Sequence, residues 1–225
     1  MKNSVESIAT RGLSILSKFF LIAFLVRELS LYSYGNFQLV SYFVLFSTTI
    51  FGLEYYNLSN RDVVSSSGKH EVYNFHFHFF LSTLGILLLV QIICFYTILP
   101  TELTTVFNFI IIFVIGFCDY LSQEIYRYLM INKKFRKANL QLIYKSLFFF
   151  ILVLTYKFIF NELEFRNVLL LMLVSYILLL VLAILTFKKV LLHNHRFKFK
   201  KLSFEKLKEV LVQLMPFITL VLFVK

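Results

Sequence analysis

The sequence predicts an all-α integral membrane protein: a six-helix transmembrane bundle plus a truncated seventh helix. Three observations predict this fold. The 225 residues are 59% hydrophobic and only 16% charged, whereas soluble domains contain about 25% charged residues. The apolar residues form runs long enough to cross a bilayer, which takes about 20 residues in a helix. Basic residues gather between alternate runs, as in multi-pass membrane proteins.

The apolar runs define six expected spans. They cover residues 12–32, 36–56, 77–98, 104–129, 141–160 and 167–187. Each run is about twice as long as a barrel strand and lacks the alternation of one, so we expect helices. Because the connections 33–35, 99–103 and 161–166 are short, consecutive spans should pair as antiparallel hairpins. Residues 1–187 are therefore expected to form one six-span transmembrane lobe.

The distribution of charge predicts the orientation of this lobe. Lys and Arg residues cluster at the N-terminus and in the connections after every second span, including 133–137, whereas the opposite connections contribute only Arg166. The positive-inside rule then places the N-terminus in the cytoplasm.

A basic linker is expected after the sixth span, at residues 188–208. Within it Ser203 can cap an amphipathic helix that would lie on the inner leaflet and attract anionic lipid. Residues 209–225 begin a further apolar segment that is short for a span. We expect this segment to be the start of a truncated seventh helix, in a protein descended from a longer one; the alternative is that the chain is a fragment of a longer protein.

The sequence lacks the usual marks of an enzyme, a metalloprotein or a nucleic-acid-binding protein. With six glycines it holds no phosphate-binding or dinucleotide-binding loop. The His-x-His pairs at 76–78 and 193–195 would point apart on a helix, and Cys94 and Cys118 lie in apolar runs. The positive charge is spread between spans and forms no recognition motif. We therefore expect no catalytic residue, metal site, cofactor or nucleic-acid partner.

Charged residues inside the spans mark the expected functional region. An ionisable side chain at the centre of a membrane helix costs roughly 2.5–3.5 kcal/mol on the insertion scale, so such residues face a bundle interior or a wet cavity. In the fourth span, Asp119, Gln123 and Arg127 share a helical face. Glu124 lies off that face but can pair with Arg127 three residues later.

Basic residues of other spans extend this region. They are Arg11, Lys18 and Arg27 of the first span and Lys145 and Lys157 of the fifth. We expect the first, second and fourth spans to surround an aqueous, partly cationic cavity, with the fifth as a further candidate. Two alternatives stay open. The long basic side chains can reach the headgroups by snorkelling, and Asp119 can form a structural pair with a Lys or Arg of the first span.

Three short motifs resemble the polysaccharide flippase family, which includes O-antigen and capsule flippases of the MATE-like superfamily. LYSYGNFQLV at 31–40 resembles the family's YG-x-F element, and IFGLEYYNLSNRD at 50–62 resembles its Gly-Leu and Arg stretch after the second span. QLMPFITLVLF at 213–223 resembles the opening of its seventh span. By this resemblance the chain corresponds to the N-terminal lobe of a two-lobe transporter in the bacterial inner membrane.

The resemblance also implies a substrate and roles for residues. The family moves undecaprenyl-diphosphate-linked oligosaccharide across the membrane, generally with coupling to an ion gradient. The implied substrate cavity contains Arg11, Lys18, Arg27, Arg61, Gln123 and Arg127. Asp119 and Glu124 are the implied residues for ion coupling or for gating salt bridges. A separately encoded C-terminal lobe is an implied partner, beside the lipid bilayer.

Three alternative functions are less well matched by the sequence. A multidrug exporter of the same superfamily would favour acidic and aromatic cavity residues over Arg and Lys. A membrane enzyme such as an O-antigen polymerase tends to need a large extracytoplasmic loop. The third alternative, a non-transporting membrane scaffold, would be contradicted by loss of transport in an Asp119→Asn variant that inserts normally.

Overall fold

The computed structural model describes residues 2–52, 85, 88–191, 205, 208 and 212, and each regular element in these ranges is helical. The long helices are α1 (Lys2–Glu28), α2 (Leu31–Gly52), α5 (Val106–Ile131), α6 (Phe135–Phe160) and α7 (Phe165–Leu191). A shorter helix covers Leu88–Ile98. The all-α prediction is confirmed for this part of the chain.

Four helices are long and apolar enough to cross a membrane, and they indicate a membrane protein. Their membrane-compatible segments are Ile8–Glu28, Val106–Met130, Phe135–Phe160 and Phe165–Phe187. α2 has 22 residues, but polar side chains such as Gln38 interrupt its apolar surface. The predicted count of six spans therefore stays a prediction.

α1, α2, α6 and α7 begin earlier than the predicted spans because helical structure continues into the flanks, whereas α5 begins at Val106, two residues after the predicted start at 104. The fifth span was expected from residue 141, yet α6 begins at Phe135. Likewise α1 begins at Lys2, ten residues before the first apolar run. The predicted linker at 188–208 and the segment 209–225 lie almost entirely outside the described residues.

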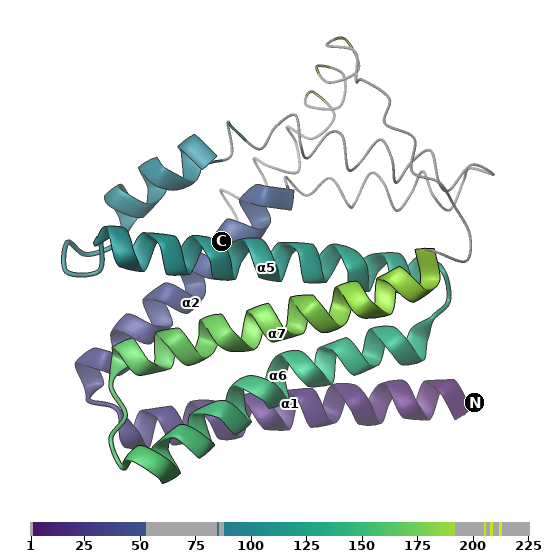
Figure 1. Ribbon diagram of the computed structural model, residues 1–225, viewed down its shortest axis with the longest axis horizontal. Helices are drawn as coiled ribbons and strands as arrows, with labels where there is room; N and C mark the ends of the chain where they lie inside the picture. Colours follow the sequence, from purple (N-terminus) through teal and green to yellow (C-terminus); the bar gives the residue numbers. More distant parts are fainter. Residues whose placement is uncertain are drawn as a thin grey trace.

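The long helices pack as a layer with one crossing helix. Figure 1 shows α5, α7, α6 and α1 side by side, with α2 crossing them obliquely. α1 packs mainly against α6, α6 also against α7, and α5 mainly against α7 and α2. α1 and α6, which correspond to the first and fifth predicted spans, thus form the most extensive contact between two helices in the described part of the chain.

Short turns join α5 to α6 and α6 to α7. The pairing of α6 with α7 is one of the predicted antiparallel hairpins, whereas α1 and α2, which were predicted to pair in the same way, make little contact. Thr105 caps α5, because its hydroxyl accepts a hydrogen bond from the backbone N–H of Asn108 at 3.2 Å. Between α5 and α6, Lys133 adopts a left-handed φ of 57°. Asn161 ends α6 with a φ of 55°, a conformation that Asn tolerates better than most residues.

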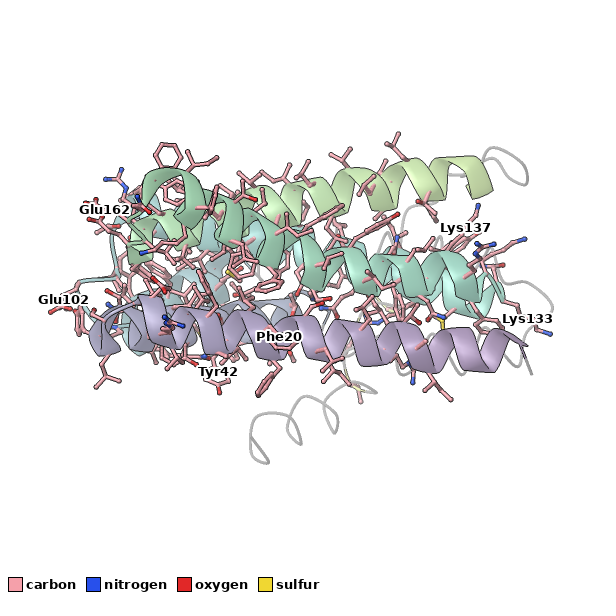
Figure 2. All side chains as sticks on the ribbon, turned by 90° about the horizontal axis from the view of Figure 1, so that it is seen from below. Phe20, Tyr42, Glu102, Lys133, Lys137 and Glu162 are labelled. Carbon is pink, nitrogen blue, oxygen red and sulfur yellow. The ribbon has the colours of Figure 1, made fainter. Side chains whose placement is uncertain are left out.

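The two ends of the bundle carry opposite charge (Figure 2). Glu102 and Glu162 lie at one end, and Lys133 and Lys137 lie at the other. We call these the acidic end and the basic end. The main hydrophobic core lies toward the acidic end, around Leu25, Phe37 and Ile112.

Candidate functional site

A buried ion pair joins α5 to α6 near the middle of the bundle. Lys145 Nζ donates a hydrogen bond to Asp119 Oδ1 at 2.5 Å. The Asp119 side chain is only 4% exposed, and that of Lys145 is 26% exposed. Both residues lie well inside helices apolar enough to span a membrane. The two charges therefore compensate each other where neither could be hydrated as in bulk water.

The turn between α5 and α6 explains why these residues meet. Asp119 is 132 − 119 = 13 residues before Asn132, and Lys145 is 145 − 132 = 13 residues after it. In an antiparallel helical hairpin, residues equally far from the turn lie at the same depth. This symmetry is a signal in the sequence that could have identified Lys145 as the partner of Asp119.

Further polar groups surround the ion pair. Gln123 Nε2 donates to the second carboxylate oxygen, Asp119 Oδ2, at 3.1 Å. The ammonium of Lys145 lies 5.4 Å from the ring centroid of Tyr176 on α7, a favourable cation–π distance. Lys18 of α1 interacts electrostatically with both charges of the pair. The site therefore draws on four helices, with Asp119 bonded through both of its oxygens.

A second pair lies nearer the basic end of α5. Arg127 donates to Glu124, as the spacing of three residues predicted. Arg127 also approaches Gln123 Oε1 at 3.5 Å, so Gln123 lies between the two pairs. The side chains of Glu124 and Arg127 are about a quarter exposed. One polar face of α5 thus runs from Asp119 to Arg127, as predicted.

The basic residues that the sequence predicted for the cavity from α1 all lie on the surface of the described bundle. Arg11 and Lys18 are exposed on the described bundle. The side chain of Arg27 is 86% exposed and has a distant contact with Glu28 at 3.9 Å. Glu28 instead pairs with Lys157 of α6 at 2.9 Å, which joins the two helices at the acidic end.

The structure thus gives Asp119 a partner on α6. The alternative drawn from the sequence placed that partner on the first span.

Arg61, the remaining expected cavity residue, lies outside the described residues. Within the described part of the chain, no three His, Cys, Asp or Glu side chains are grouped as metal ligands. The expected cationic cavity stays a prediction.

A tight helix crossing lies next to the site. A Cβ atom added to Gly116 would approach Ser47 Cβ of α2 to 3.1 Å. Gln91 Nε2, from the helix Leu88–Ile98, donates to Ser47 Oγ at 2.7 Å. This contact of three helices lies one turn from Asp119 and fixes the position of α5 against α2.

Comparison of the chain with family models, with curated proteins and with solved structures finds no match. The case for a function therefore depends on the residues themselves.

Proposed function

We propose that the chain forms one lobe of a membrane transporter that moves a lipid-linked oligosaccharide, as the resemblance to polysaccharide flippases implies. The observation that carries this proposal is the Asp119–Lys145 pair inside apolar helices. Ionisable residues at such positions are rare and are usually associated with ion or substrate pathways. In this proposal the substrate is undecaprenyl-diphosphate-linked oligosaccharide in the bacterial inner membrane.

The charges around the pair suit an anionic headgroup. Lys18 and Lys145 bring two positive charges near the single negative charge of Asp119. A diphosphate approaching from the exposed side of α1 would meet Lys18 first. The strong hydrogen bonds that ammonium groups give to phosphate oxygens would favour its binding.

Within this function Asp119 has the role of a coupling or gating residue. Its carboxylate joins α5 to α6, and Gln123 connects it to the Glu124–Arg127 pair. A change in the protonation or pairing of Asp119 would alter the contact between the two helices. Such a two-state contact is what coupling between an ion and a transport step requires.

A non-transporting helical scaffold is the second candidate function. The observation in its favour is that both carboxylate oxygens of Asp119 already accept a hydrogen bond inside the protein. A satisfied buried pair can serve structure alone, and its replacement by uncharged residues is often neutral for stability. The two candidate functions therefore differ in what they predict for a variant that folds normally but lacks both charges. A transporter would lose its activity, whereas a scaffold would keep its role.

Binding of the substrate tests the proposal most simply. The 225-residue protein in lipid nanodiscs is titrated with radiolabelled undecaprenyl-diphosphate-linked oligosaccharide. We expect saturable binding, and a Lys18→Met variant should bind about tenfold more weakly, because a lost charge-assisted bond costs at least about 1.5 kcal/mol. Arg166→Met is the matched control, since Arg166 lies at the acidic end against Phe107 and should not affect binding.

The outcomes separate the candidates. Saturable binding that depends on Lys18 supports the flippase proposal. Saturable binding of lipophilic cations in place of the lipid-linked oligosaccharide would point to an exporter of the multidrug class. No saturable binding of either ligand would contradict a transport function and favour the scaffold.

A further inference from the structure

The interior of the bundle changes character at the depth of the Asp119–Lys145 pair. On α1, α5 and α6 the buried side chains toward the acidic end are apolar, and those toward the basic end include polar ones. On α1, α5 and α6 the apolar set is Leu21, Leu25, Leu29, Ile111, Ile112, Ile115, Phe149 and Val153. The polar set on the same helices is Ser14, Ser17, Asp119, Ser122, Asn139, Gln141 and Ser146.

Two amides in the polar half lack hydrogen-bond partners within the described part of the chain. Asn139 is 4% exposed and Gln141 is 6% exposed. The carbonyl oxygen of Asn139 and both polar atoms of Gln141 are buried and unbonded there. Each such group would cost about 1–3 kcal/mol if it stayed dry. Buried polar groups in native proteins almost always meet a protein partner or an ordered water.

These amides lie between the basic end and the ion pair. Gln141 precedes Lys145 by four residues, so the two side chains are neighbours on α6. Asn139 lies a further half-turn toward the basic end and precedes the buried Ser146 by two turns. The unbonded polar atoms therefore form a series along α6, between the charged turn at 132–134 and Lys145.

We propose that the basic-end half of the bundle holds water that reaches the Asp119–Lys145 pair from that end only. The ligand of this site is water, with small hydrophilic ions able to follow the same path. Water would satisfy Asn139 and Gln141 and would also hydrate the Lys145 side chain, which is 26% exposed. On α1, α5 and α6 the core beyond Phe149 has only apolar buried side chains, so water stops there. Gln91 Oε1, which is also buried and unbonded, lies outside these three helices at the crossing of α2 and α5.

This arrangement makes the ion pair accessible from one side of a membrane. The charges are hydrated toward the basic end and insulated by the apolar core toward the acidic end. Hydration on one side also lowers the cost of keeping two charges inside apolar helices. The inference concerns water access alone, so it does not depend on which substrate the protein carries.

Cysteine reactivity in sealed vesicles tests this one-sided access. A thiol reacts as its thiolate, which forms in water and is suppressed in an apolar interior. The background protein has Cys94→Ala and Cys118→Ala, and single cysteines are introduced as Gln141→Cys or Val153→Cys. Both positions lie on α6, one in the polar half and one in the apolar core. The probe is silver ion, which is small enough to follow water and is excluded by the bilayer.

Two exposed positions report the side of the vesicle to which the probe was added. Lys133→Cys marks the basic end and Glu102→Cys marks the acidic end (Figure 2). Ser146→Cys is a second test position in the polar half, and it replaces a hydroxyl by a thiol of similar size. It keeps the experiment decisive if Gln141→Cys fails to fold, as judged by a monodisperse elution profile.

We expect cysteine at 141 or 146 to react only when silver is added on the side where Lys133→Cys reacts. The reaction should be at least about tenfold faster than that of Val153→Cys, in keeping with the suppressed ionisation of thiols in apolar surroundings. Silence at both polar positions while Lys133→Cys reacts would overturn the proposal. Reaction from the acidic end, or equal reaction at Val153→Cys, would overturn it as well.

Discussion

Replacing Asp119 by Asn should destabilise the protein because it leaves the ammonium of Lys145 unpaired. At 2.5 Å the pair attracts with about 7 kcal/mol at an effective dielectric constant near 20, most of which offsets the cost of burying both charges. Breaking a buried pair by removing one partner typically costs about 3–5 kcal/mol. Because the Lys145 side chain is 26% exposed, we expect about 3 kcal/mol, the lower end of that range.

The double variant Asp119→Asn/Lys145→Gln provides the comparison, since it removes both charges and leaves none unpaired. It should lie within about 1 kcal/mol of the wild type, because neutral replacement of a buried pair is often close to neutral in stability. Glu28→Gln is the matched control at the acidic end. It breaks a pair with Lys157, which lies in the last turn of α6 at the end of the bundle. The C-terminal turn of a helix favours a positive charge, so the unpaired ammonium should cost at most about 1 kcal/mol there.

Unfolding in mixed micelles of dodecyl maltoside and increasing sodium dodecyl sulfate measures these free energies, with helix content followed by circular dichroism. A loss under about 1 kcal/mol for Asp119→Asn, equal to that of the Glu28→Gln control, would refute the reasoning from a buried unpaired charge. A double variant that is as unstable as Asp119→Asn would refute it as well. In that case shape or hydrogen bonding, and not charge, would account for the loss.

Other substitutions test individual contacts by the same unfolding measurement. Gly116→Ala should lie at least about 1 kcal/mol below Gly12→Ala, since both gain helix propensity but only the former crowds Ser47 Cβ at 3.1 Å; equal stabilities would contradict the tight crossing. Thr105→Ala removes the cap of α5 and should cost about 1 kcal/mol, whereas Thr105→Ser should retain stability. Asn161→Val should cost about 1 kcal/mol or more because a β-branched residue resists a φ of 55°, and Asn161→Gly should be tolerated; an unchanged valine variant would count against the left-handed cap.

Local features of this structure follow from the sequence because their causes are local. Hydropathy and length predict α5, α6 and α7, and the spacing of Glu124 and Arg127 predicts their pair. The polar start of α6 was missed, because hydropathy marks the part of a helix that suits lipid and not the helix itself.

The neighbours of each helix were not predictable in the same way. Nothing local in α1 indicates that it packs on α6, since that choice depends on how all the apolar faces fit together. For this reason the sequence suggests a partner for Asp119 on the first span, whereas the structure places it on α6. The short turn at 132–134 contains the missing information, since it brings Asp119 and Lys145 to equal depth.

The measurement that tests the central claim most directly is binding of lipid-linked oligosaccharide to the double variant Asp119→Asn/Lys145→Gln. The 225-residue protein in lipid nanodiscs is titrated with the radiolabelled ligand, an assay that one lobe can satisfy without its partner. We predict that the wild type and Glu28→Gln bind the ligand saturably, while the double variant folds normally and binds it at least about tenfold more weakly. Binding by the double variant with the wild-type affinity, or no saturable binding by the wild type, would contradict a transport role for the buried pair.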